Sequence, residues 1–378
     1  MASWFFSARA KPHSGSDPVC AIKAPIDHLE RVPEFKQAAV LKRRFDPTES
    51  KIMKAINLKN FGGPEVMVYG EAARPVAGPD QILIKVAATS VNRPDIVQRQ
   101  GHYAPPEGES QILGLEVAGT VESMGTNVSN WHRGDRVMAL IGGGGYAQYA
   151  LAHQDHAMAM PDNMSFEMAA CVCETYITAY LNVFLLGGLQ DSQRVLLHGG
   201  GGGVNTAAIQ LCRALVPETE IFVTASTGKM DRVAALGAHR VIDYTRENFA
   251  GVIQDSTHRQ GVNVILDHIG AAYFERNMKS LSVSGTLMLI GVMGGVKTEV
   301  NLALAMVKRQ TIMGSVLRSR STAEKTGIID RFARTVVPLM ARGEVTPLIS
   351  EVFPLPEAAR AHRVMESSGH FGKIVLIV

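Results

Sequence analysis

The feature that most constrains the fold is an unbroken run of glycines at residues 199–203, placed between two apolar segments. The preceding residues 195–197 are typical of a buried strand, and apolar residues recur at helical spacing over residues 204–215. Without a Cβ atom, glycine lets backbone N–H groups approach a pyrophosphate, and the positive end of the following helix favours an anion. We therefore predict a dinucleotide site in a Rossmann fold, with Gly202, Gly203 and Val204 among the cofactor-binding residues.

The end of the next strand indicates which dinucleotide is bound. NAD sites usually carry an acidic residue about 20 residues after the loop, where it binds the ribose hydroxyls. Here the strand at residues 221–223 leads to Ser226 and Lys229, and no acid occurs before Asp231. A hydroxyl and an ammonium group suit a 2′-phosphate, so we predict NADPH. The alternative for Lys229 is an ordinary solvated lysine at a helix start.

The rhythm of the chain predicts an α/β protein with two kinds of domain. From about residue 176, apolar strands at 221–223, 241–242, 262–267 and 286–290 alternate with helices such as 230–236, which is typical of a parallel sheet covered on both faces. Short β-branched segments at 81–87, 117–122 and 136–141 precede them and predict a mostly β domain. We expect a flexible extension at residues 1–52, a catalytic domain at 53–175, the Rossmann domain at 176–314, and a return to the catalytic domain at 315–378. That last part is predicted to hold one long helix over 323–341 and a strand over 373–378.

Composition excludes several classes of function. Lys and Arg number 38 against 35 Asp and Glu, so the chain lacks the basic excess of a nucleic-acid clamp. No run of about 18 apolar residues is present, so we expect no membrane insertion. The four cysteines are expected to be reduced, buried side chains rather than disulfides or metal ligands.

The first 52 residues allow two interpretations. No acidic residue occurs before Asp17, a weak likeness to a mitochondrial leader, although the mixed charges that follow depart from that pattern. The other interpretation is a flexible appendage, or an upstream start with Met53 as the functional one. We expect a cytoplasmic protein, or a mitochondrial one if this segment acts as a leader.

With these motifs in place, the chain from residue 53 onward resembles the medium-chain dehydrogenases/reductases, in particular the quinone oxidoreductase group. The resemblance is carried by residues 92–103, 112–116, the glycine loop with 206–210, 317–320 and 372–376. It implies a GroES-like catalytic domain beside the Rossmann domain, a homodimer, and NADPH as cofactor.

The resemblance also implies roles for individual residues. Tyr103 would line the nicotinamide and substrate pocket with Asn92 beside it, while Lys229 and Tyr244 would contact the adenosine 2′-phosphate end. Gly291, Met293 and the segment 315–317, which includes Leu317, would flank the nicotinamide. One departure is Asn205, which stands where the family's Gly-Gly-Val-Gly motif has its last glycine. We expect cofactor binding to be retained, with Asn205 adding bulk, capping the helix or donating a hydrogen bond.

The zinc-dependent relatives use Cys and His ligands that this chain lacks. Leu115 replaces the ligand His, and the four-cysteine structural lobe is absent, so a tetrahedral site cannot be assembled and alcohol oxidation is not expected. The resemblance implies instead an NADPH-dependent reductase that passes reducing equivalents to a quinone without metal. Quinones are electrophilic, so proximity and orientation suffice. Tyr103 either donates a hydrogen bond to the quinone oxygen or only shapes the pocket.

Two alternative functions remain open. One is NADPH-dependent reduction of 2-alkenals or enones, in which another electrophilic carbonyl compound takes the hydride. The other is a low-turnover NADPH-binding structural or RNA-binding protein, which the near-neutral charge disfavours. We expect His198, His268 and Glu116 to be structural, and we leave Arg318 and Arg320 between a solvated edge and the cofactor phosphates.

Overall fold

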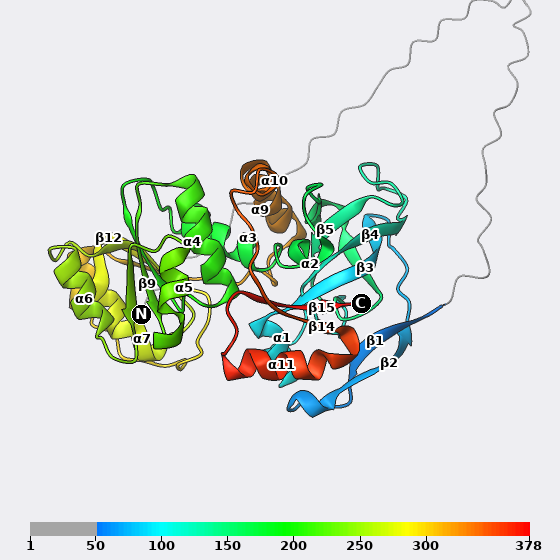
Figure 1. Cartoon of the computed structure of the whole chain (residues 1–378), viewed down its shortest axis with the longest axis horizontal. Coiled ribbons are helices and arrows are strands. Elements are labelled where there is room, and N and C mark those ends of the chain that lie inside the picture. Colours follow the sequence, from blue (N-terminus) through cyan, green and yellow to red (C-terminus); the bar gives the residue numbers. More distant parts are fainter. Residues whose placement is uncertain (1–50) are drawn as a thin grey trace, which may run out of the picture. The chain divides into compact units, whose positions relative to one another are not determined.

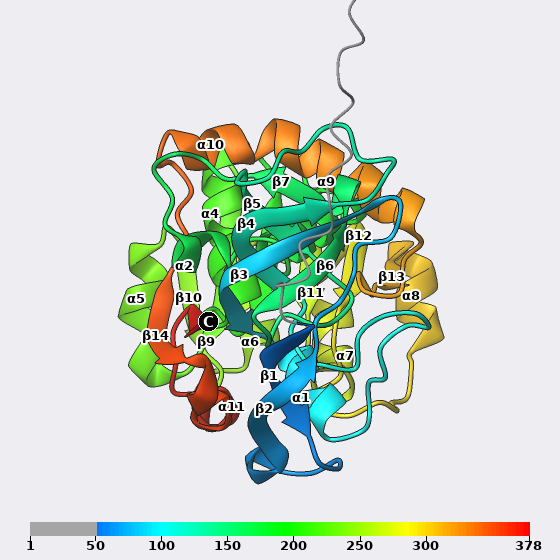
Figure 2. The ribbon, with the colours of Figure 1, turned by 90° about the vertical axis from the view of Figure 1, so that its right-hand side faces the viewer.

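The structure, a computed structural model, describes residues 51–378. This part of the chain is built around two large sheets (Figures 1 and 2). The first is a six-stranded parallel sheet in the order β10-β9-β8-β11-β12-β13. Counted along the chain, this is the 3-2-1-4-5-6 order of a Rossmann fold, and it confirms the predicted α/β class. Its elements are β8 (Arg194–His198), α4 (Gly203–Leu215), β9 (Glu220–Ala225), α5 (Met230–Ala235), β10 (Arg240–Asp243), α6 (Phe249–Ser256), β11 (Val262–Asp267), α7 (Ala271–Ser280), β12 (Leu281–Leu289), α8 (Leu302–Lys308) and β13 (Thr311–Gly314).

Continuous apolar strands explain why this sheet is covered on both faces. Leu196 and Phe222 pack with α6 and α7, whereas Leu197 and Val223 belong to the core on the opposite face, with α3 and α4. Alternate residues of one strand thus point into two separate cores, as the pleat of a strand requires.

The second sheet, here called the mixed sheet, runs in the order β14-β15-β3-β4-β5-β7, with β6 paired to β3. Its β15 strand lies antiparallel to β3, so the end of the chain returns to a sheet built mostly from residues 81–159. The strands are β3 (Gln81–Val91), β4 (Glu116–Met124), β5 (Arg136–Leu140), β6 (Tyr149–His153), β7 (Ala157–Ala159), β14 (Ile349–Pro354) and β15 (Lys373–Ile377), with a hairpin of β1 (Ile52–Leu58) and β2 (Met67–Ala73) nearby. The domain limits expected from the sequence stay a prediction.

Helices complete this part of the chain. They are α1 (Arg93–Arg99), α2 (Phe166–Ala169), α3 (Thr175–Tyr180), which continues as a π-helix over Leu181–Leu186, α9 (Thr322–Thr335), α10 (Val337–Ala341) and α11 (Ala358–Ser367). The predicted single helix over 323–341 is wrong: it ends after Thr335 and a new helix begins at Val337 (Figure 2). Pro338 is the cause, because it has no N–H for the preceding turn and is favoured in a first turn.

Sequence patterns missed the edge strands β7, β13 and β14, which are short or exposed, and the hairpin β1–β2. The two interpretations of residues 1–52 fall almost entirely outside the described residues. Within residues 51–378, no helix combines the length and the apolar character needed to cross a bilayer.

Candidate functional site

The glycine loop lies at the point where the strand order of the parallel sheet reverses, between β8 and β11. Ligands of open α/β sheets bind at the carboxyl ends of the strands at such a point. The N–H groups of Gly199 and Gly200 donate to the carbonyl of Thr224 at 3.0 and 2.9 Å, which ties the loop to β9. A Cβ atom on Gly203 would lie 2.6 Å from Cδ of Lys373, so a larger residue at the start of α4 would have to displace this buried lysine side chain. The first turn of α4 presents N–H groups that no earlier helical carbonyl can accept.

Asn205 lies near the start of α4, and its side chain hydrogen-bonds to the main chain at the glycine loop. Its Nδ2 atom donates to the carbonyl oxygens of His198 and Gly199, the second at 3.2 Å. The side chain is buried, and its Oδ1 atom has no partner in the part of the chain that the structure describes. Asn205 was expected to add bulk, to cap the helix or to donate a hydrogen bond, and in the structure it donates hydrogen bonds. The larger side chain is accommodated because its amide donates hydrogen bonds to two carbonyl oxygens that would otherwise need water as a donor.

His268 and the segment after β12 line the other side of the reversal point. A Cβ atom on Gly199 would lie 2.8 Å from Cε1 of His268, so the imidazole packs directly over the loop. A Cβ atom on Gly291 would lie 3.1 Å from Cβ of His268, and the N–H of Met293 donates to the His268 carbonyl at 3.1 Å. Burial lowers the pKa of His268 to about 4, which keeps the ring neutral. Its side chain makes no hydrogen bond to other residues in 51–378, so the expectation of a satisfied histidine is not met.

The predicted adenosine end is built from the ends of β9 and β10. Ser226 is half-buried at the end of β9, and the N–H of Tyr244 donates to the Ala225 carbonyl at 3.2 Å. Asp243, which the sequence reasoning missed because it belongs to the next strand, accepts a hydrogen bond from Thr227 at 2.5 Å. Hydrogen bonds from Thr227 and Thr245 lower the pKa of Asp243, so a carboxylate stands beside this end of the site.

Lys229 crosses the glycine loop instead of lying free in solvent. A Cβ atom on Gly201 would lie 2.5 Å from Cδ of Lys229. The ammonium group donates to the carbonyls of Ser368 and His370 at 2.7 and 2.6 Å, and burial lowers the pKa of Lys229. Its positive charge thus sits at the loop, held by neutral acceptors rather than by a carboxylate.

A buried polar network joins the loop to the mixed sheet. Lys373 Nζ lies 3.0 Å from Oε1 of Glu116 and 2.5 Å from Oδ1 of Asn92. The same Glu116 oxygen accepts from Asn92 Nδ2 at 3.0 Å and from Ser90 at 2.5 Å, while its other oxygen accepts from the N–H of Glu174 at 2.9 Å. Since Gly372 also donates to the Gly201 carbonyl at 2.9 Å, the chain end connects both sheets. Asn92 is thus held by hydrogen bonds to Glu116 and Lys373, and the catalytic role expected for it beside Tyr103 stays a prediction.

Tyr103 and Arg318 contact each other, and the electrostatic influence of Glu174 reaches both side chains. The Arg318 guanidinium carbon lies 5.1 Å from the centre of the Tyr103 ring, a cation–π contact. Arg318 Nε and Nη2 donate to the Gly142 carbonyl at 2.8 and 2.5 Å, whereas its buried Nη1 has no partner among residues 51–378. Burial and the nearby Glu174 raise the pKa of Tyr103, so its hydroxyl stays protonated. Leu317, the preceding residue, is buried in the hydrophobic core.

The residues at the zinc-ligand positions do not fit that metal. Leu115 is buried and apolar, and Asn92 is engaged in the network described above. The three cysteines in residues 51–378 are buried, and burial raises the pKa of Cys212 to about 12, which disfavours the thiolate that zinc requires. In the same residues, no group of three or more His, Cys, Asp or Glu side chains is arranged to hold a metal ion.

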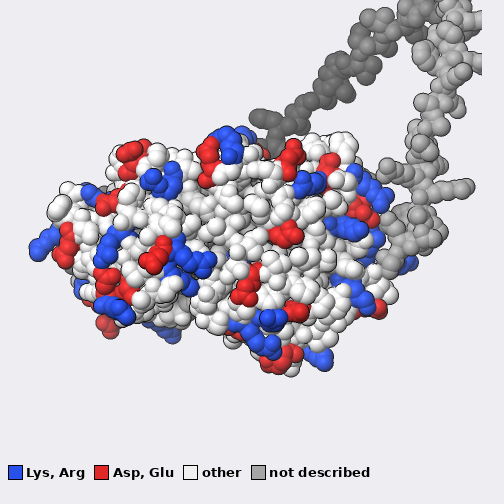
Figure 3. Space-filling view, in the orientation of Figure 1, with Lys and Arg blue, Asp and Glu red and all other residues white. Residues whose placement is uncertain are grey.

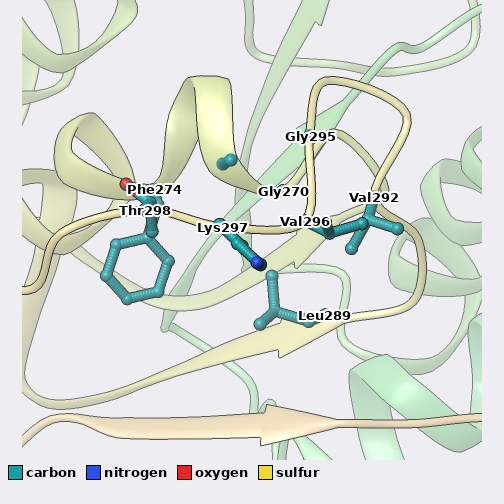
Figure 4. A pocket seen from close by; sticks show the side chains of 9 residues that line it. Gly270, Phe274, Leu289, Val292, Gly295, Val296, Lys297 and Thr298 are labelled. Carbon is teal, nitrogen blue, oxygen red and sulfur yellow. The ribbon is translucent and has the colours of Figure 1, made fainter.

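A cavity of about 490 Å³ lies beside the segment 291–293 but on the surface of the Rossmann domain (Figure 4). Its walls are mostly apolar: Phe274 comes from α7, Leu289 from the end of β12, and Val292 and Val296 from the following loop. Lys297 also lines it, and none of the network residues does. The cavity therefore adjoins the segment 291–293 that is predicted to flank the nicotinamide.

Comparison with known proteins assigns the family. Residues 78–162 match the alcohol dehydrogenase GroES-like domain, and residues 236–376 match a family described as zinc-binding dehydrogenase. A quinone oxidoreductase of Sus scrofa is 34% identical over 88% of this chain and 99% of its own length. A mycobacterial protein solved with NADPH (28% identity, TM-score 0.77) and a quinone oxidoreductase of Pseudomonas syringae (26%, TM-score 0.78) each match 86% of this chain and all of their own.

The sequence also resembles, within this group, the p53-inducible quinone oxidoreductase; that narrower likeness is a prediction, since these matches do not separate the subgroups. The zinc-binding description belongs to the wider family, and the residues at the ligand positions here are not zinc ligands. The match to the Sus scrofa protein covers nearly all of that relative and exceeds 30% identity, and the fold agrees with it. The chain therefore belongs to the quinone oxidoreductase family, a zinc-independent group of the medium-chain dehydrogenases/reductases.

Proposed function

We propose that this protein is an NADPH-dependent quinone oxidoreductase. The observation that carries the proposal is the connection between the two sheets: the glycine loop, with Lys229 across it, is joined through Gly372 and Lys373 to the network that borders Tyr103. In this proposal a dinucleotide bound on the loop extends toward Tyr103 and Arg318, which contact each other. The relatives named quinone oxidoreductase and the related structure solved with NADPH support this assignment.

When bound, NADPH supplies the reducing equivalents, and the protein binds, orients and shields. The N–H groups at the start of α4 and the Lys229 ammonium favour the phosphates. The neutral His268 and Gly291 lie on the side of the proposed cofactor site nearest the end of β12. Tyr103 offers a flat ring for stacking with a quinone, and Arg318 holds that ring in place. Because quinones are already electrophilic, positioning supplies most of the rate enhancement.

The test is oxidation of NADPH and NADH by the full chain with ortho- and para-quinones and with 2-alkenals, with and without a metal chelator. We expect quinone reduction, a preference for NADPH and no effect of the chelator. Turnover of alkenals alone would support the enone reductase instead. NADPH binding without any oxidation would support a binding protein. Mixed positive and negative side chains on the face shown in Figure 3 agree with the absence of a basic excess.

A homodimer is part of this proposal. Strand β13 ends the parallel sheet, so its outer edge has no neighbouring strand in the described residues, and Ile312 on it is exposed. The helix before it exposes Leu302, Met306 and Val307, each at 70% or more. Bare sheet edges and large apolar patches are normally covered. Pairing of β13 with its copy across a two-fold axis would cover both and extend the sheet.

Sedimentation velocity of the full chain tests the homodimer. We expect a dimer that Ile312→Lys converts to monomer, because a charged lysine on an edge strand opposes pairing. A wild-type monomer at micromolar concentration would contradict it. Location in the cytoplasm or, through residues 1–52, in mitochondria is also a proposal. Imaging of the full chain beside a chain that starts at Met53 tests it.

A further inference from the structure

A second cavity lies at the end of the parallel sheet opposite to the glycine loop. Its volume is about 360 Å³, and small-molecule sites begin at about 300 Å³. Arg194 on its wall is the first residue of β8, whereas the glycine loop follows the last residue of that strand. Asn263 and Ser282, near the starts of the neighbouring strands β11 and β12, also line it. The cavity therefore lies at the amino ends of three strands, while the cofactor is expected at their carboxyl ends.

Three cationic side chains line this cavity, and no acidic residue of the described part of the chain does. Arg194 comes from β8, Arg259 from the turn between α6 and β11, and Lys308 from the end of α8. Of the three, only Arg194 pairs with a carboxylate, that of Glu220 on β9, at 3.0 Å. Three cations less one paired carboxylate leave two positive charges around the cavity without an acidic partner in residues 51–378.

The neutral side chains of the wall leave donors free rather than acceptors. The side-chain oxygen of Gln260 accepts a hydrogen bond from Nη1 of Arg194 at 2.9 Å, and the side-chain oxygen of Asn263 accepts from the main-chain N–H of Arg194 at 3.0 Å. The amide nitrogens of Gln260 and Asn263 have no partner in the described residues. Both residues line the cavity, so N–H groups beside the cations are available to an anion.

Capping of helix ends explains Lys308 but does not explain Arg259. Lys308 Nζ donates to the carbonyls of Lys279 and Leu281 at 3.1 and 2.6 Å, at the end of α7, where the helix dipole favours a cation. The Arg259 side chain is exposed and makes no hydrogen bond, ion pair or ring contact within residues 51–378. Its backbone is left-handed (φ 63°), a conformation that favours glycine, and its N–H donates to the Gln254 carbonyl at 2.7 Å, which fixes the turn. The turn thus presents a guanidinium group that no other group of this region occupies.

We propose that this cavity binds the phosphate group of a small phosphomonoester. Such a group carries a charge of about −1.5 to −2 at pH 7 and three acceptor oxygens, which match two unpaired cations and the free amide donors. The planar fork of Arg259 can hold two of these oxygens at once. None of the lining residues belongs to the glycine loop or to the polar network of Glu116 and Lys373. The inference is therefore independent of the proposed quinone reduction.

The test is isothermal titration calorimetry of the full chain with phenyl phosphate and with inorganic phosphate, at constant ionic strength. The protein is saturated with NADPH, because the glycine loop would otherwise bind phosphate itself. We expect one phenyl phosphate per chain, with its ring against Val283 on the cavity wall. Arg259→Gln should weaken this binding by at least about tenfold. Since Arg259 has no partner in the described residues, the variant should unfold at the wild-type temperature when no phosphate is present, which excludes a folding defect.

Arg331→Gln is the matched control. Arg331 is an exposed arginine on α9 that lies outside the cavity and has no hydrogen bond or ion pair in residues 51–378. Its replacement removes the same charge and should leave the affinity for phenyl phosphate unchanged. Equal weakening by both substitutions would overturn the inference, because net charge alone would explain it. Loss of binding on addition of NADPH would also overturn it, as would binding of inorganic phosphate without phenyl phosphate.

Discussion

The buried pair of Lys373 and Glu116 allows a quantitative test of how the two sheets are joined. The two side chains are 4% and 0% exposed, with 3.0 Å between Nζ and Oε1. Replacing Lys373 with Met removes the cation but keeps an apolar stem against Gly203. Glu116 is then left as a buried carboxylate, with hydrogen bonds from Ser90, Asn92 and the Glu174 N–H as its remaining support.

The size of the effect follows from the loss of one partner only. Breaking a buried pair on one side leaves an uncompensated charge and costs about 3–5 kcal/mol of the free energy of unfolding. We expect Lys373→Met to fall in this range. Glu116→Gln should also destabilise, because it removes the negative charge that pairs with Lys373 and turns one acceptor oxygen into a donor group that faces other donors. The double variant contains neither charge, so it should be less destabilised than Lys373→Met alone.

Urea denaturation followed by circular dichroism gives the four free energies of this double-mutant cycle. Lys279→Met is the control, since Lys279 pairs with Glu275 on the exposed side of α7 at 2.6 Å and should leave stability almost unchanged. Strictly additive effects of the two buried substitutions would refute the reasoning, because they would mean that the charges do not support each other.

Three further predictions follow from single contacts. Asn205→Asp places an acceptor against the carbonyls of His198 and Gly199, so binding of NADPH should weaken by at least about tenfold, measured by fluorescence titration. Burial lowers the pKa of His198 to about 3, so the unfolded chain takes up the proton first and stability is lost as pH falls below about 6.5. In His198→Gln the slope of unfolding free energy against pH, measured between about pH 6 and 4, should shrink by about 1.4 kcal/mol per pH unit. Lys229→Met should raise the KM for NADPH more than the KM for NADH. If both KM values change equally, Lys229 does not recognise the 2′-phosphate.

The parts that the sequence predicts are those whose cause is local. A strand, a glycine run and a helix follow each other within about 20 residues, and steric and electrostatic rules for that order point directly to a dinucleotide site. The cores of the strands were predicted for the same reason, because an apolar run is itself the signal. One helix was expected over 323–341 because its apolar residues follow a helical pattern, but Pro338 divides it in the structure.

Residues that act over long sequence separations gave no such signal. Glu116 reads as a buried acid between apolar neighbours, but its partner Lys373 lies 257 positions away, where it looks like an ordinary lysine at a strand start. Lys229 reads as a phosphate ligand, and its two carbonyl acceptors are 139 and 141 positions away. Burial, with the repulsion of Glu116, raises the pKa of Glu174, and only the fold creates these surroundings, so its sequence neighbours give no sign of the shift.

These long-range contacts all pass through the short segment at residues 368–373. Ser368 and His370 accept from Lys229, Gly372 donates to the loop carbonyl of Gly201, and Lys373 meets Glu116. The cofactor loop and the network bordering Tyr103 are thus held by the same stretch of main chain. Any shift of this segment must move the phosphate end and the acceptor end of the site together. Selection for a fixed distance between cofactor and acceptor would therefore act on the end of the chain as strongly as on the glycine loop, because positioning is what catalysis without a metal depends on.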